Sequence, residues 1–130
     1  MTENEIANRI MDASFYIHRE LGPGLLESVY EAVLAKKLTD FGLVVERQLP
    51  VAICFEGVTF DEGFCADLVV EKKVIVELKS IDKLHTVHYK QLLTYLRLTD
   101  CRLGLLINFG ESLLKDGFKR VVNGLEESSA

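Results

Sequence analysis

The feature that most constrains the fold is an apolar run near the C-terminal end, Leu103-Gly104-Leu105-Leu106-Ile107-Asn108-Phe109. A run without regular polar alternation is typical of a central β-strand that is buried on both faces. Such a strand needs covering layers, and a chain of 130 residues is long enough to bury a core of this kind. We therefore expect an α/β fold, with one domain over residues 1–130 and a sheet flanked by helices.

Helical spacing and capping signals predict three helices. Thr2 and Glu5 form a capping-box pattern, and the helix that they begin should end at Gly22-Pro23-Gly24. A second helix follows and ends at Gly42, and a third spans about residues 84–98. The side chains expected to be buried are Leu26, Val29, Tyr30, Val33, Leu38 and Phe41 in the second helix, and Leu84, Val87, Leu92, Tyr95 and Leu98 in the third.

The remaining apolar segments are rich in β-branched residues and predict a mixed, mainly antiparallel sheet. Strands are expected at 43–48 and 51–55, separated by Pro50, with turns at Gly57 and at residues 61–63. Further strands are expected at 64–70, 74–79, 103–109 and 118–122, the first two joined as a hairpin through residues 71–73. Residues 1–23 form an N-terminal helix and turn, and residues 123–130 are expected to be a frayed tail.

Charge and cysteine content exclude some classes of protein. The net charge of −5 argues against a protein that coats nucleic acid by bulk charge, although residues 71–120 carry ten basic and six acidic side chains. No apolar stretch is long enough to span a membrane, and the acidic start differs from a signal peptide, so we expect a cytoplasmic protein. Its three cysteines are expected to be buried thiols rather than disulfides or a zinc site.

Two acidic residues and a lysine in the predicted hairpin could form a catalytic site. A three-residue turn at 71–73 pairs residue 70 with residue 74 and therefore places Asp67 opposite Glu77. Two carboxylates about 5 Å apart can hold one divalent cation, and Lys79 lies on the same strand face as Glu77. The alternative is a solvated strand with an ordinary ion pair, and a two-residue turn would separate the carboxylates.

Polar residues also fall in helical positions that could face this site. His88 and Gln91 lie on the predicted apolar arc of the third helix, where buried polar groups need partners. Glu27 lies in the first turn of the second helix. The alternative interpretations are core side chains with satisfied hydrogen bonds and, for Glu27, simple stabilisation by the helix dipole.

The segment Gly24-Leu25-Leu26-Glu27-Ser28-Val29-Tyr30 reads G-x-x-E-x-x-Y, and the chain resembles the GxxExxY family, a branch of the PD-(D/E)XK nuclease superfamily. The resemblance extends from about residue 18 to residue 122. Its other motifs occur in the expected order, namely Ala66-Asp67, Glu77-Leu78-Lys79 and Gln91-Leu92-Leu93-Thr94-Tyr95. Ala66 stands where the motif name has proline, a change that the superfamily often tolerates.

The resemblance implies a restriction-endonuclease-like fold and a Mg²⁺ site, with Mn²⁺ as a second candidate ion. It implies that Asp67, Glu77 and the carbonyl of Leu78 bind the ion, that Glu27 completes the acidic cluster, and that Lys79 assists the attacking water. Gln91 and Tyr95 resemble the Q-x-x-x-Y element of RecB-like nucleases, which orients catalytic groups or contacts nucleic acid. The four cysteines of an iron–sulfur cluster are absent from the sequence, so we expect none.

Two functions from different classes follow. The first is a metal-dependent nuclease that hydrolyses phosphodiester bonds of DNA, with RNA as a second candidate substrate. The alternative is a catalytically weak or silent nuclease-fold subunit that binds or regulates other proteins, because a fold can outlast its activity. The expected partners are nucleic acid, and a second copy of the chain or a larger complex, without a membrane.

Overall fold

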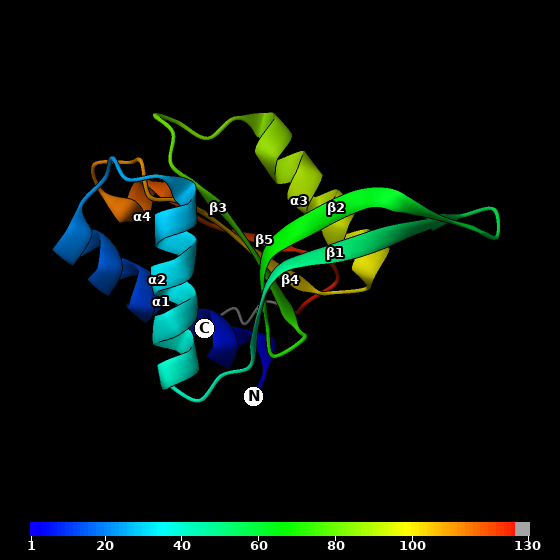
Figure 1. The fold of residues 1–130 in the computed structure, drawn as a ribbon, viewed down its shortest axis with the longest axis horizontal. Helices are drawn as coiled ribbons and strands as arrows, with labels where there is room; N and C mark the ends of the chain where they lie inside the picture. Colours follow the sequence, from blue (N-terminus) through cyan, green and yellow to red (C-terminus); the bar gives the residue numbers. More distant parts are fainter. Residues whose placement is uncertain (127–130) are drawn as a thin grey trace.

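The computed structural model describes residues 1–126 and shows a mixed α/β fold built on a five-stranded sheet (Figure 1). Part of the predicted tail, residues 127–130, lies outside the described residues. The elements in chain order are α1 (Glu3–Leu21), α2 (Glu27–Asp40), β1 (Val45–Phe55), β2 (Val58–Val70), β3 (Val74–Lys79), α3 (Thr86–Thr99), β4 (Leu103–Asn108), α4 (Leu114–Gly117) and β5 (Phe118–Val122). The predicted class, a mainly antiparallel sheet flanked by helices, is confirmed.

The sheet follows chain order, β1-β2-β3-β4-β5, and only the pairing of β3 with β4 is parallel within the described residues. Helix α3 supplies the crossover that this parallel pairing requires. The predicted central strand is confirmed, because every residue of β4 is buried between its two neighbours. Parallel pairing also brings the carboxyl ends of β3 and β4 to the same edge of the sheet, next to each other.

Two apolar layers cover the sheet. Helices α1 and α2 pack on one face through a cluster that includes Ile10, Tyr30 and Leu34. Helix α3 packs on the other face through Leu92 and Leu96. Figure 1 shows this arrangement, with α1 and α2 on one side of the strands and α3 on the other. No helix among residues 1–126 is both long enough and apolar enough to cross a bilayer.

The boundaries of α1 agree with the prediction. The Thr2 hydroxyl caps the helix by accepting the backbone N–H of Glu5, and the Glu5 carboxylate accepts the backbone N–H of Thr2. At the other end Gly22 adopts a φ of 72°, which a residue with a side chain rarely adopts, so the helix ends there as expected.

The predicted buried stripes of α2 and α3 are partly wrong. Leu26, Val29 and Phe41 are exposed in or beside α2, and Val87 and Leu98 are exposed on α3. Each helix contacts its neighbours along a narrow line, which in α2 consists of Tyr30, Glu31, Leu34, Ala35 and Leu38. A charged residue, Glu31, thus occupies a buried position on α2, and several large apolar residues lie outside it.

The prediction of two strands around Pro50 is wrong, because β1 is a single strand that passes through this residue. β1 lies at the edge of the sheet, where a strand has a neighbour on one side only and can accommodate a proline, which has no N–H to donate. The turn expected at residues 61–63 is also absent. These residues lie inside β2, opposite a shift in the β1–β2 register between Val51 and Ile53, which is a β-bulge or similar irregularity. Gly63 lies directly against the carbonyl of Val51.

The long β1–β2 hairpin projects beyond the helices as an arm (Figure 1). This arm explains why the prediction of buried cysteines is wrong. Cys54 and Cys65 lie on the arm and are exposed, and Cys101 is half-buried. Apolar sequence around a cysteine predicts burial only where another layer covers that face of the strand. Cys54 lies towards the tip of the arm, and Cys65 alternates with Phe64 and Ala66, which pack towards α3, so its side chain lies on the other face.

Candidate active site

The turn between β2 and β3 has the predicted register, with Val70 paired to Val74 and Leu68 paired to Val76. The paired positions end at that point. The Asp67 side chain then reaches β3, where its Oδ2 accepts the backbone N–H of Leu78 at 2.8 Å. A carboxylate therefore substitutes for the main-chain acceptor at the place where the two strands part, and this bond holds Asp67 beside the neighbouring Glu77.

Glu77 has the most perturbed environment in the site. Burial and the adjacent Asp67 carboxylate raise the pKa of Glu77 to about 8, and the nearby Lys79 ammonium opposes them only in part. Its Oε1 atom is buried and has no hydrogen-bond partner among the described residues. A buried carboxylate oxygen without a donor is costly, so this atom is suited to binding a cation or a proton.

A buried asparagine supports the segment that follows Lys79. Asn108 Oδ1 accepts the N–H groups of Ile81 and Gly110 at 3.0 and 3.1 Å, and Asn108 Nδ2 donates to the Ile81 carbonyl at 2.9 Å. The Lys79 carbonyl accepts the N–H of Phe109 at 2.8 Å. Sequence reasoning treated Asn108 only as part of an apolar strand, although an amide inside such a run indicates a buried polar contact.

The glycine and tyrosine of the G-x-x-E-x-x-Y segment are structural. Gly24 has a φ of 105°, which favours glycine. The Tyr30 hydroxyl donates to the Gly22 carbonyl at 2.5 Å and accepts the Leu25 N–H at 3.2 Å, and its ring stacks on Phe109 at 4.4 Å. Tyr30 therefore holds the turn that precedes α2 against the core.

Glu27 is the first residue of α2 and is exposed. The end of β3 lies near this turn, because Ser80 Oγ donates to the Leu25 carbonyl at 2.6 Å. Over residues 1–126, however, no three His, Cys, Asp or Glu side chains converge closely enough to hold one metal ion. The acidic cluster of three that includes Glu27 is not formed in this structure, and a role for Glu27 stays a prediction.

Sequence reasoning missed two residues next to Asp67. Gln48 Nε2 donates to Asp67 Oδ1 at 3.1 Å and to Glu31 Oε1 at 2.6 Å, and Glu31 is buried. Glu31 also forms an ion pair with Arg47 at 3.1 Å. One signal was available for Glu31, since it lies one helical turn after Glu27 and therefore on the same side of α2. Nothing in the local sequence marks Gln48.

Helix α3 contributes the aromatic side chain of Tyr95 to the site. It also carries two polar side chains, Gln91 and His88, of which Gln91 is exposed. The Tyr95 ring stacks on Phe64 of β2 at 3.6 Å between centroids, and burial together with the Glu77 carboxylate raises the pKa of Tyr95. Gln91 is exposed, so its predicted place in the buried arc is wrong. His88 is half-buried and accepts the His85 N–H at 3.0 Å through Nδ1; burial and the charges of Lys79 and His85 lower its pKa.

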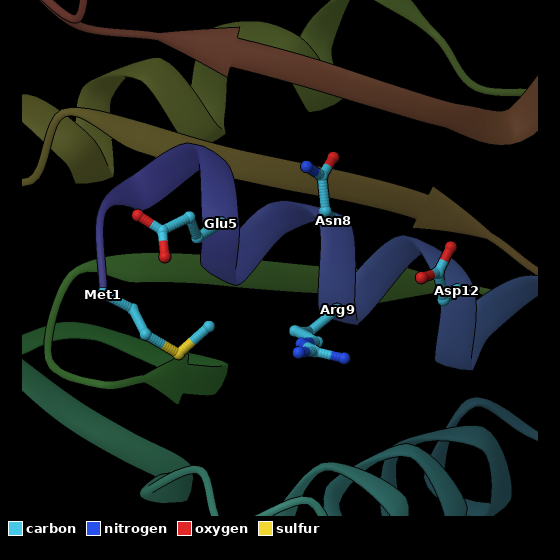
Figure 2. Close-up of a pocket in the computed structure, with 5 residues that line it drawn as sticks. All are labelled: Met1, Glu5, Asn8, Arg9 and Asp12. Atoms are coloured by element: carbon cyan, nitrogen blue, oxygen red, sulfur yellow. The ribbon is translucent and has the colours of Figure 1, made fainter.

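A separate pocket lies along the first half of α1 (Figure 2). It has a volume of about 260 Å³ and is lined by Met1, Glu5, Asn8, Arg9 and Asp12. No predicted site residue lines it. The candidate site is therefore defined by side-chain chemistry at the β2–β3 junction rather than by the concavity on α1.

The strand order, the β2–β3 junction and the E-x-K triplet agree with one family. The sequence model of the PD-(D/E)XK nuclease superfamily matches residues 4–121. The chain belongs to the PD-(D/E)XK nuclease superfamily. No curated protein and no solved structure shows significant similarity to it. As a PD-(D/E)XK protein the chain has a restriction-endonuclease-like core, and the superfamily suggests nuclease activity and nucleic acid as a partner.

PD-(D/E)XK nucleases generally use divalent metals such as Mg²⁺. Two observations show that the residues of this chain fit such an ion. Glu77 offers a buried oxygen that lacks a donor, and Asp67 supplies a second carboxylate beside it. Oxygen ligands of this type suit Mg²⁺, which is commonly bound through one or two carboxylates and retained waters.

Proposed function

We propose that this protein is a Mg²⁺-dependent nuclease, able to use Mn²⁺, that hydrolyses phosphodiester bonds of DNA and has RNA as a second candidate substrate. We assign it to the GxxExxY branch on the residues of its G-x-x-E-x-x-Y segment. One observation carries the proposal. Glu77 has a buried oxygen without a partner beside a second carboxylate and a lysine, an arrangement that is costly unless a proton or a cation neutralises it.

Asp67 and Glu77 would hold the ion, together with the carbonyl of Leu78, and Glu27 would approach from the exposed start of α2. When bound, the ion supplies polarisation of a phosphoryl oxygen and neutralises negative charge. The bond from the Leu78 N–H keeps Asp67 turned towards β3. Burial keeps Glu77 away from bulk water, which strengthens its interaction with a cation.

Lys79 lies two residues beyond Glu77 and thus on the same face of β3. Its ammonium group would orient the attacking water and stabilise the negative charge that develops on the phosphate. The stacked rings of Tyr95 and Phe64 lie near Glu77, and Gln91 is exposed one helical turn before Tyr95. We propose that Gln91 and Tyr95 contact the nucleic acid or orient the catalytic groups.

The test is cleavage of labelled single-stranded, double-stranded and flap DNA, and of RNA, in Mg²⁺, Mn²⁺ and Ca²⁺. Asp67→Ala, Glu77→Ala and Lys79→Ala should each abolish cleavage. Lys72→Ala is the matched control, because Lys72 is an exposed lysine in the turn at the opposite end of β3. Activity in all three site variants would contradict the proposal. Equal rates in Ca²⁺ and Mg²⁺ would also contradict it, since Ca²⁺ positions a nucleophile less strictly.

A second candidate function is a catalytically silent binding or regulatory subunit. The observation that favours it is the lack of a convergent group of three acidic or histidine side chains within residues 1–126. The same assay separates the two functions. A wild-type protein that binds nucleic acid or a protein partner but cleaves none of the substrates in Mg²⁺ or Mn²⁺ supports the silent subunit.

A further inference from the structure

Gln48 makes a bridge between two carboxylates from different elements. Its Nε2 atom lies 2.6 Å from Glu31 Oε1 on α2 and 3.1 Å from Asp67 Oδ1 on β2. A primary amide carries two hydrogens on one nitrogen, so it can donate to both oxygens at once. Gln48 holds this position from β1 with a φ of 48°, in the left-handed region, which is uncommon for a residue with a side chain.

The bridge completes a set of donors around both carboxylates. Glu31 Oε2 receives Arg47 Nε at 3.2 Å, and Asp67 Oδ2 receives the Leu78 N–H at 2.8 Å. Each of the four carboxylate oxygens therefore has at least one donor. Because the two Asp67 oxygens are held from opposite sides, by Gln48 from β1 and by Leu78 from β3, the plane of that carboxylate is restrained.

The neutral charge of the bridging group matters. Two carboxylates that share a small volume repel each other unless a donor lies between them. A lysine or arginine at position 48 would remove this repulsion, but it would also neutralise part of the charge that attracts a cation to Asp67. The Gln48 amide orients the Asp67 carboxylate through a hydrogen bond but carries no charge, so Asp67 retains its full attraction for a cation.

We infer that Gln48, supported by Glu31, is a positioning residue that orients Asp67 for a divalent cation. The inference rests on the proposed function, because it concerns the same metal site. Residues that orient metal ligands through hydrogen bonds commonly change metal affinity by about 10- to 100-fold when they are replaced.

The test measures the Kd for Mn²⁺ by titration calorimetry in Gln48→Ala and Gln48→Asn. Asparagine keeps an amide and tolerates a positive φ, but it is one methylene shorter and cannot span both carboxylates. Both variants should bind Mn²⁺ about 10- to 100-fold more weakly than wild type. Thr59→Ala, at an exposed position on the same hairpin, should leave the Kd unchanged.

A second measurement needs neither metal nor activity. Hydrogen exchange of the Leu78 amide, followed by NMR in chelator, reports how firmly Asp67 accepts that bond. Exchange at Leu78 should accelerate about tenfold or more in both Gln48 variants, because an Asp67 carboxylate that has lost its charge-assisted bond from Gln48 accepts the Leu78 N–H less firmly. Exchange at Val76, earlier in the same strand, should not change, whereas a general loss of stability would accelerate both amides.

The outcomes separate the two claims. Unchanged Mn²⁺ affinity and unchanged Leu78 exchange in the Gln48 variants overturn the positioning role and leave the nuclease proposal intact. A wild-type protein that binds no Mn²⁺ overturns the metal-dependent activity itself, whatever the exchange rates are. Weaker Mn²⁺ binding with selective acceleration at Leu78 supports the inference.

Discussion

Replacing Glu77 with glutamine should stabilise the metal-free protein at neutral and alkaline pH. The folded protein raises the pKa of Glu77 from 4.5 to about 8 through burial and the Asp67 charge. Below pH 4.5 the carboxyl group is protonated in both the folded and the unfolded chain, and the perturbation costs nothing. As the pH rises from 4.5 towards 8, Glu77 loses its proton in the unfolded chain but keeps it in the folded protein. The unfolded state is therefore favoured, and folding stability falls across this window.

The magnitude follows from the size of the pKa change. Each pKa unit corresponds to ~1.4 kcal/mol, so the full cost above pH 8 is about 5 kcal/mol. Because Glu77 is mostly rather than fully buried, water entry and side-chain relaxation reduce this cost to about 2–5 kcal/mol. Glutamine has the same shape without the charge. Glu77→Gln should therefore match wild type near pH 4 and exceed its free energy of unfolding by about 2–5 kcal/mol at pH 8.5.

The assay is urea unfolding of both proteins in chelator at intervals from pH 4 to pH 9. The difference between the two free energies of unfolding isolates Glu77, because the other titrating groups are common to both proteins. Glu62→Gln makes the same chemical change at an exposed position on the arm and serves as the control. A difference between Glu77→Gln and wild type that stays constant from pH 4 to pH 9 would refute the reasoning.

Three further predictions concern the same site. Mn²⁺ at a hundredfold excess over its Kd should stabilise wild type by ~2.7 kcal/mol in thermal melts, and this rise should be largely missing in Asp67→Asn and Glu77→Gln; equal rises in all three proteins would exclude these carboxylates as ligands. Tyr95→Phe keeps the stack on Phe64 and should change the free energy of unfolding by less than about 1 kcal/mol while lowering cleavage per folded molecule, a result that urea titration and rates on one preparation can check. Asn108→Ala removes three hydrogen bonds from a fully buried site and should destabilise by about 2–5 kcal/mol in urea, whereas a loss below ~1 kcal/mol would contradict its supporting role.

Short-range signals determined much of the fold. The capping box at Thr2, the glycine at position 22 and the apolar run of β4 each depend on neighbours within a few residues, and the structure confirms all of them. The three-residue turn after β2 likewise set the register of β2 and β3, because strand alternation transmits a turn length along both strands. That register is the reason why turn length alone predicts that Asp67 and Glu77 lie near each other.

Long-range packing decided the rest. The burial of Glu31 and the exposure of Leu26 depend on which line of α2 meets the sheet, and helical periodicity leaves that choice open. The exposure of Cys54 and Cys65 depends on which parts and faces of the β1–β2 arm the helices cover, which is a property of the assembled layers.

The surroundings of Asp67 show the same division most clearly. Its carboxylate, its strand and its partner Glu77 follow from the sequence, because they require only local geometry and a turn of known length. The bridge from Gln48 joins residues from α2, β1 and β2, which meet only when the helix packs against the sheet. Local patterns describe neighbours along the chain, whereas the orientation of the Asp67 carboxylate depends on donors that folding brings from elsewhere, so only the tertiary structure could supply them.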